Sequence, residues 1–142
     1  MKRDDALHVT VPVLLGGLIY VAFRSPEHLL FQWAHAARLD GLVAALREIC
    51  GSIRPSSEWL LFSLPDGLWL YGFACFMHVT WRGNGVEACG WRWLPLALAL
   101  GSETAQGLGI LQGTFDPADV VTYLAAFAVA AMRTPQPVEA TT

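Results

Sequence analysis

The chain of 142 residues has the length of one domain, and its composition is too apolar for an ordinary soluble protein. Hydrophobic residues make up 54% and charged residues 15%, whereas about a quarter of a soluble domain is charged. The net charge of −3, without any run rich in Lys and Arg, argues against a nucleic-acid partner. Cys50, Cys75 and Cys89 have no CxxC spacing, which excludes a disulfide framework and a zinc site.

The first apolar segment, residues 6–23, predicts a transmembrane helix of nearly the minimum length that crosses a bilayer. Pro12 predicts a bend or a late helix start. Gly16, Gly17 and Ala22 offer a face of small residues to a neighbouring helix. No small-residue cleavage pattern follows the segment, so we expect it to be a retained helix and not a signal peptide.

The long connection, residues 24–63, is predicted to contain an amphipathic helix that lies at the membrane interface. Its apolar residues recur at helical spacing: Leu39, Leu42, Val43, Leu46, Ile49 and Cys50. His28 and His35 are seven residues apart and thus share a helical face. They are either interfacial histidines, which we favour, or a ligand pair; His8 and His78 belong to no cluster.

Three further spans are predicted at residues 65–81, 91–112 and 117–133, and residues 134–142 are expected to form a disordered tail. Trp81, Trp91 and Trp93 are typical interfacial anchors. The chain has no strand pattern. The sequence therefore predicts an all-α integral membrane bundle of four transmembrane helices in a single domain, 1–133, with the amphipathic helix between the first and second spans.

Basic residues at the span ends favour a multi-pass protein with both termini in the cytoplasm. One side of the predicted bundle carries Lys2, Arg3, Arg82, Arg92 and Arg133; the other carries Arg24, Arg38, Arg47 and Arg54 within one long loop. In either orientation, an even number of spans places five polar residues on the face of the long connection: Asp66, Gln112, Thr114, Asp116 and Asp119.

Glu103 is the most unusual polar residue, because it lies inside the third predicted span. It follows Trp93 by ten residues, or about 15 Å of helix, which places it near the midplane, where a charge costs about 2.5–3.5 kcal/mol. Gln106 projects to the same side, one turn further on. Glu103 is either a packing residue bonded to a backbone or tyrosine partner, or a functional acid, base or ligand anchor.

Asp116 and Asp119 begin the fourth predicted span in the pattern of a strong helix start. Asp116 suits the N-cap, Pro117 the first helical position and Asp119 the third. Thr122 and Tyr123 share the face of Asp119 and extend a polar stripe into the bundle. The candidate ligand-binding residues are Glu103, Gln106, Asp116, Asp119 and Asp66, and the candidate catalytic residues are Glu103 and Asp119.

The spacing of these carboxylates matches no recognised metal motif, and the chain has no nucleotide-binding, zinc-protease or nucleophile-elbow pattern. No metal and no cofactor are therefore expected.

Two segments resemble the C-terminal half of VanZ-like membrane proteins: Ser102-Glu103-Thr104-Ala105-Gln106 and Gly113-Thr114-Phe115-Asp116-Pro117-Ala118-Asp119. They match the E-x-x-Q and F-D-x-x-D patterns of that family. Tyr123 stands where the family often has Asn, and Gly113 where it often has Arg. The resemblance implies a bacterial envelope protein that affects sensitivity to teicoplanin-type glycopeptide antibiotics, or the handling of envelope lipids.

Two alternatives remain open: a membrane enzyme acting on a lipid-linked substrate, and a non-catalytic membrane scaffold subunit. The absence of a nucleophile or metal motif makes the enzyme the less favoured of these readings. The expected partners are membrane lipids, envelope precursors or other membrane proteins.

Overall fold

The computed structural model describes residues 2–26, 29–53, 55–82 and 90–133. These ranges contain no strand, and the principal helices are α1 (Arg3–Phe23), α2 (Leu29–Ala36), α3 (Asp40–Gly51), α4 (Glu58–Thr80), α6 (Leu94–Gly107) and α7 (Pro117–Arg133). The predicted all-α class is confirmed. The predicted tail at residues 134–142 lies outside the described residues, as do His28 and Cys89.

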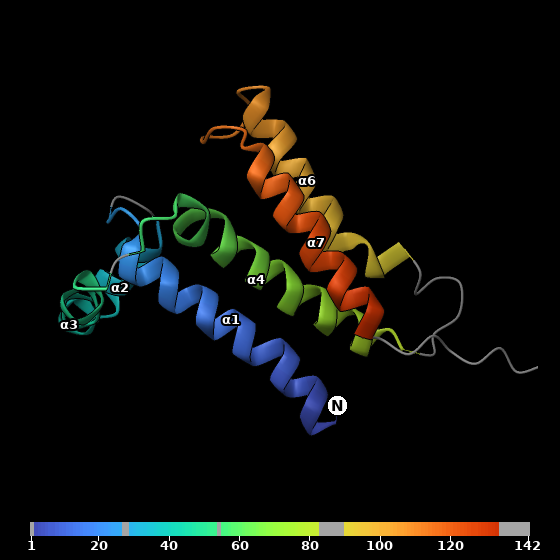
Figure 1. The fold of residues 1–142 in the computed structure, drawn as a ribbon, viewed down its shortest axis with the longest axis horizontal. Helices are drawn as coiled ribbons and strands as arrows, with labels where there is room; N and C mark the ends of the chain where they lie inside the picture. Colours follow the sequence, from blue (N-terminus) through green and yellow to red (C-terminus); the bar gives the residue numbers. More distant parts are fainter. Residues whose placement is uncertain (1, 27–28, 54, 83–89, 134–142) are drawn as a thin grey trace, which may run out of the picture.

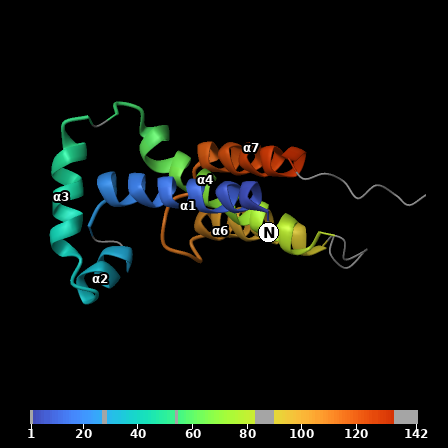
Figure 2. The same cartoon turned by 90° about the horizontal axis from the view of Figure 1, so that it is seen from below.

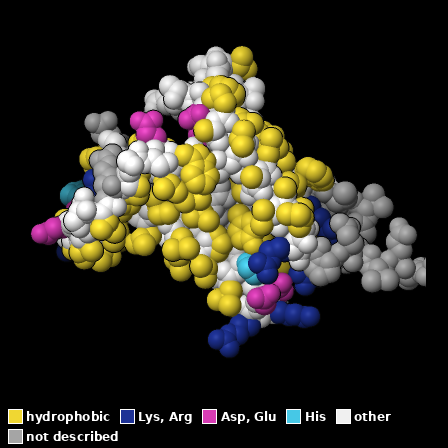
Figure 3. All heavy atoms as spheres, viewed as in Figure 1, with side chains coloured by type: hydrophobic (Ala, Val, Ile, Leu, Met, Phe, Trp, Pro, Cys, Tyr) yellow, Lys and Arg dark blue, Asp and Glu magenta, His cyan; other side chains and the backbone are white. Residues whose placement is uncertain are grey.

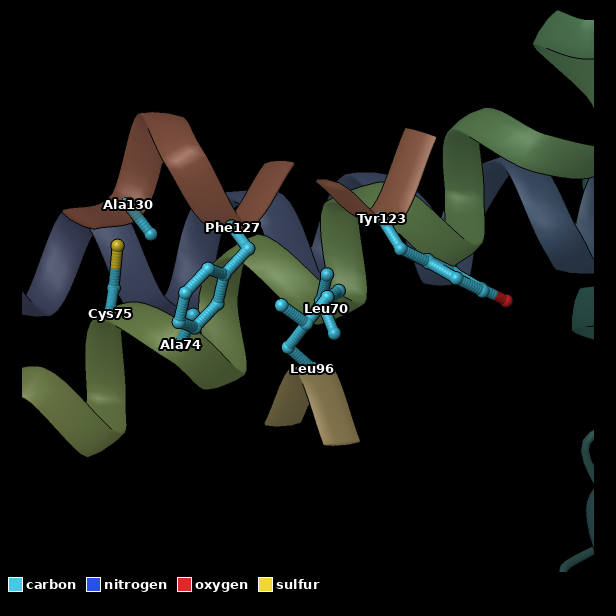
Figure 4. Close-up of a cluster of buried hydrophobic side chains, with 7 residues drawn as sticks. All are labelled: Leu70, Ala74, Cys75, Leu96, Tyr123, Phe127 and Ala130. Carbon is cyan, nitrogen blue, oxygen red and sulfur yellow. The ribbon is translucent and has the colours of Figure 1, made fainter. Parts of the chain in front are cut away.

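Helix α4 is the centre of the bundle (Figure 1). It packs against α1, against α7 and, less extensively, against α6, which also lies beside α7. The core lies where α4, α6 and α7 meet (Figure 4), and it consists of Leu70, Ala74, Cys75, Leu96, Tyr123, Phe127 and Ala130.

Small residues bring α1 and α4 close together, as the sequence predicted. A Cβ on Gly16 would lie 2.9 Å from the carbonyl oxygen of Pro65. A Cβ on Gly72 would lie 3.0 Å from the carbonyl oxygen of Val9. Ala22 is also buried. Gly17 is the exception, because a Cβ there would meet no atom within 4 Å.

Two helices are long and apolar enough to cross a membrane: α1, with 21 residues, and α4, with 23. Helices α6 and α7 have 14 and 17 residues, or about 21 and 25 Å, against a hydrocarbon core of about 30 Å. Together they form an antiparallel hairpin beside α4. Of the four expected spans, two therefore have the length and composition of a transmembrane helix.

The prolines do not start the first two long helices. Helix α1 begins at Arg3, well before Pro12, and α4 begins at Glu58, seven residues before the expected start at Pro65. Packing stabilises the early turns of α4 although Pro65 cannot donate a backbone hydrogen bond, because Leu61 and Ser63 are buried there. The indole Nε1 of Trp59 also donates a hydrogen bond to Thr122 Oγ1 at 2.8 Å, which ties this turn to α7.

The third predicted span, 91–112, is wrong at its C-terminal end, because α6 stops at Gly107. The backbone N–H groups of Gly109 and Ile110 donate hydrogen bonds to the carbonyl oxygens of Gln106 and Ala105. Gly109 has a φ of +71°. These are the bonds and the left-handed residue of a Schellman motif, a common helix terminator. Gly109 therefore helps to end the helix, which sequence hydropathy alone did not indicate.

The long connection forms two helices, and α3 covers nearly all of the predicted amphipathic segment from Leu39 to Cys50, with α2 preceding it. Arg38 separates them with a φ of +58°. Figure 2 shows α3 running across the end of α1. Arg47 holds it there, donating from Nε to the carbonyl oxygen of Val21 at 3.0 Å and also bonding the carbonyl oxygen of Arg24. We call α2, α3 and their bend the arm.

The start of α1 and the end of α4 meet at the opposite end of the bundle, where Arg82 forms an ion pair with Asp5 at 3.2 Å. Arg92 bonds the carbonyl oxygen of Trp81 at 3.0 Å, and the rings of Trp81 and Trp91 stack 5.7 Å apart. Lys and Arg side chains gather at this end (Figure 3). We call it the basic end.

Candidate functional site

The phenol of Tyr123 lies at the centre of the candidate site. Its side chain is 7% exposed and points away from Phe127 and Ala130, out of the core cluster (Figure 4). It interacts electrostatically with four charged residues from different parts of the chain: Asp66 on α4, Glu103 on α6, Asp119 on α7 and Arg24 after α1. We call these five residues the Tyr123 site.

Asp66 connects the acidic residues of the site with its arginine. It is half-buried and interacts electrostatically with Arg24, Asp119 and Glu103. The structure thus brings together three of the carboxylates that the sequence singled out. They converge because α4 and α7 both begin at the end of the bundle where α6 stops.

Glu103 lies closer to a helix end than the sequence indicated. Only four residues, or about 6 Å of helix, separate it from the end of α6 at Gly107. Its side chain is 3% exposed, and Oε2 accepts a hydrogen bond from the backbone N–H of Asp116 at 3.2 Å. The helix is shorter than expected, so Glu103 meets the polar α6–α7 turn. The sequence left two roles open for Glu103, a packing residue or a functional group. A backbone hydrogen-bond partner is what the packing role predicts.

The turn leaves different roles for the two aspartates of α7. Asp116 Oδ1 accepts a hydrogen bond from the backbone N–H of Ala118 at 2.8 Å, as an N-cap residue does. In a capping box Asp119 would accept from the N–H of Asp116, but Glu103 occupies that donor. Asp119 Oδ1 is buried and has no hydrogen-bond partner among the described residues. It is therefore a carboxylate that the fold alone does not explain.

Gln106 and Asp116 lie beside the Tyr123 site and not within it. The Gln106 amide packs on Gly113, where an added Cβ would lie 2.8 Å from Gln106 Cδ. Asp116 interacts electrostatically with Glu103. Of the five expected ligand residues, the structure therefore groups Asp66, Glu103 and Asp119, and places Gln106 and Asp116 in the adjoining turn.

A cleft of about 470 Å³ leads to the site between α4 and α6. Asp66, Ser102 and Tyr123 provide its polar part. Its remaining walls are apolar: Trp69, Leu70, Phe73, Pro95, Leu98 and Ala99. Glu103 and Asp119 do not line the cleft, but they interact electrostatically with Tyr123 and Asp66, which do. We call it the α4–α6 cleft.

Sequence reasoning missed Arg24 as a site residue and treated it as a marker of membrane orientation. Its guanidinium lies 5.4 Å from the ring centre of Tyr20 and 5.0 Å from that of Phe62. Its Nε atom is buried without a hydrogen-bond partner in the described part of the chain. No sequence pattern links Arg24 to Asp66, because their proximity depends on how α1 packs on α4. Tyr123 did have a signal, since it follows Asp119 by one helical turn.

A second polar cluster lies near the basic end. The phenol of Tyr71 is hydrogen-bonded to His8 Nδ1 at 3.0 Å and interacts electrostatically with Cys75 and Arg133. His8 Nε2 lies 3.8 Å from Asp4. His8 therefore belongs to a cluster that the sequence did not reveal. His78 is a satisfied core residue, with Nδ1 2.7 Å from the carbonyl oxygen of Ala74.

Within the described residues, no group of three or more His, Cys, Asp or Glu side chains is arranged to hold a metal ion. Comparison with known proteins finds no matching family model, no matching curated protein and no matching solved structure. The Tyr123 site and the α4–α6 cleft therefore carry the functional argument.

Proposed function

We propose that this chain is a VanZ-like integral membrane protein of the bacterial envelope that binds an amphiphilic envelope molecule in the α4–α6 cleft. One observation carries the proposal: apolar walls lead to a polar end made by Asp66 and Tyr123. Glu103 and Asp119 add negative charge around the same phenol. Binding sites of this kind combine apolar walls with a few polar groups that orient the ligand.

The charges favour a ligand with a hydrogen-bond donor or a positively charged group at its polar end. Three carboxylates and one guanidinium interact electrostatically with Tyr123, so acidic side chains outnumber basic ones at the site. The apolar walls suit a hydrocarbon chain. Lipids and lipid-linked envelope precursors combine a chain with a polar group, and lipidated glycopeptides such as teicoplanin do so too.

We propose that the bundle lies in the inner membrane with its basic end in the cytoplasm. The lengths of α1 and α4 support insertion. Lys2, Arg3, Arg82, Arg92 and Arg133 support the orientation, because basic residues near span ends favour the cytoplasmic side. The α6–α7 hairpin then runs beside the two longer helices, with its turn towards the outer face.

The test compares teicoplanin sensitivity in a strain without the gene and in strains that express the wild type, Glu103→Gln, Asp66→Asn or Glu48→Gln. Glu48 is an exposed acid on α3 and serves as the matched control. We expect loss of the gene, Asp66→Asn and Glu103→Gln to shift sensitivity in the same direction, and Glu48→Gln to behave as wild type. Equal sensitivity in every strain would remove the antibiotic link.

A second candidate function is catalysis on a lipid-linked substrate, with Asp119 as general base. The buried, unpartnered Oδ1 atom of Asp119 favours this candidate. The measurement is the turnover of a polyprenyl-phosphate or phospholipid pool by membranes that contain the wild type or Asp119→Asn. Loss of turnover in Asp119→Asn, at equal protein level, supports catalysis. Turnover that persists in this variant removes Asp119 as the base.

A further inference from the structure

A second, larger groove lies between the arm and the outer face of α1, about 570 Å³ in volume and lined by apolar residues. Leu14, Gly17 and Leu18 of α1 form one wall, and Trp33, Leu42 and Leu46 of the arm lie opposite. Leu14 and Leu42 are each 68% exposed and Trp33 is 64% exposed. The groove is remote from the α4–α6 cleft, with which it shares no lining residue.

The walls of this groove are fixed relative to one another. Arg47 joins α3 to the carbonyl oxygen of Val21, and its guanidinium lies 4.6 Å from the ring centre of Phe31 on α2. Phe31 is buried and stacks on Tyr20 of α1, with 6.3 Å between the ring centres. A site whose walls are held in place needs little reorganisation to bind.

One basic residue, Arg38, adjoins the lining of the groove in the chain, although it does not itself line the groove. Arg38 stands at the α2–α3 bend between Ala37 and Leu39, which both line the groove. Its side chain is exposed, and within the described residues it forms no ion pair, whereas the nearby Asp40 is paired with His35 at 3.0 Å. A guanidinium beside an apolar channel suits a phosphate at the head of a hydrocarbon chain.

We infer that this groove holds one acyl chain of a phospholipid, whose phosphate is bound by Arg38. The outer face of α1 is the surface that a membrane-crossing helix presents to lipid, and Figure 2 shows the arm projecting beside it. We favour a phospholipid as the occupant because the apolar walls match its acyl chain and Arg38 matches its phosphate. The inference rests on the membrane insertion proposed above and is independent of the α4–α6 cleft.

Gly17 and Gly101 provide a matched pair of test variants. Both glycines are helical, and a Cβ on either would meet no atom within 4 Å. Gly17→Phe fills the groove, whereas Gly101→Phe places the same ring on α6, outside it. Ala34→Phe fills the groove from the α2 side and replaces Gly17→Phe if that variant does not fold. Arg38→Asn removes the charge but keeps a residue that tolerates positive φ.

The experiment is native mass spectrometry of the full chain in detergent with added phosphatidylglycerol, and with diacylglycerol as the ligand that lacks a phosphate. We expect Gly17→Phe to retain one phosphatidylglycerol fewer per chain than the wild type, and Gly101→Phe to retain as many as the wild type. Arg38→Asn should weaken retention about fivefold, towards the level of diacylglycerol.

Equal retention by the two Gly→Phe variants would overturn the inference. A change in dimer content of Gly17→Phe, without loss of lipid, would make the groove an interface between copies and would also overturn it. Equal retention of the two ligands by the wild type would overturn the assignment of the phosphate to Arg38. Since no outcome depends on antibiotic sensitivity or on Asp66, the failure of this inference is distinguishable from failure of the proposed function.

Discussion

Glu103 shows how a costly buried carboxylate can be stabilised by a single backbone donor. Its Oε2 atom accepts the N–H of Asp116, which would otherwise be an unpaired group at the start of α7. The same bond prevents Asp119 from closing a capping box and leaves a free carboxylate oxygen near Tyr123. The packing of Glu103 and the unpaired oxygen of Asp119 thus both depend on one hydrogen bond.

We expect Glu103→Ala to lower the free energy of unfolding by about 0.5–1.5 kcal/mol, because the partly buried hydrogen bond from the N–H of Asp116 is lost. Glu103→Gln should cost less, since its amide oxygen can still accept. Thermal unfolding in detergent, followed by circular dichroism, measures both. Equal destabilisation by Ala and Gln would show that the charge of Glu103, and not its acceptor oxygen, stabilises the turn.

Gly67 marks the closest approach of α4 to α7. A Cβ there would lie 2.4 Å from Thr122 Cγ2, so Gly67→Ala should force the helices apart at a cost of about 1–3 kcal/mol. Adding Thr122→Ser should restore most of the stability, because serine lacks the clashing methyl group and keeps the oxygen that Trp59 bonds. Additive losses in the double variant, measured by thermal unfolding, would contradict this packing.

At the scale of elements, the sequence predicted best where local chemistry decides the outcome. Helix α7 was expected at residues 117–133 and is observed there, because Asp116 and Pro117 form a strong start. The end of α6 was missed, because an apolar segment with two glycines permits either a continued helix or a Schellman motif. Pro65 was misread as a helix start, since tertiary packing stabilises the turns before it.

The sequence also predicted part of the candidate site and missed the rest. An even helical topology was enough to place Asp66 and Asp119 at one end of the bundle. It was insufficient for Arg24, whose approach to Asp66 depends on the rotation of α1 about its axis and on the end of that helix. The depth of Glu103 was also wrong, because it depends on where α6 stops.

The Schellman motif gives a prediction for the α6–α7 hairpin. Gly109→Ala should destabilise the protein by about 1–2 kcal/mol, because a Cβ is unfavourable at a φ of +71°. Gly101→Ala, in the helical part of α6 with open space around it, should be neutral or stabilising. Both are compared by thermal unfolding. Equal effects would mean that α6 does not end at this motif.

At the scale of the whole molecule, the helix order places both ends of the described bundle on one side. The ion pair between Asp5 and Arg82 joins the start of α1 to the end of α4, and Arg133 at the end of α7 interacts electrostatically with Tyr71 of α4. The α6–α7 turn lies at the other end (Figure 1). The structure therefore makes a definite prediction about membrane topology.

Single cysteines test this topology in a chain whose native cysteines are replaced. A membrane-impermeant maleimide should label Gln112→Cys in intact cells, because Gln112 is exposed in the turn that we place at the outer face. Arg3→Cys and Arg133→Cys should react only after the membrane is opened. Labelling of all three in intact cells would contradict the proposed orientation.

The most direct test of the central claim, that an amphiphile binds in the α4–α6 cleft, is photo-cross-linking in native membranes. A photoreactive amino acid replaces Leu98, which lines the cleft and is 58% exposed, or Val121 on α7, which is 66% exposed and outside it. We expect position 98 to give an adduct of discrete mass that position 121 lacks, and Asp66→Asn to reduce its yield. The same adducts at both positions, unaffected by Asp66→Asn, would contradict the account.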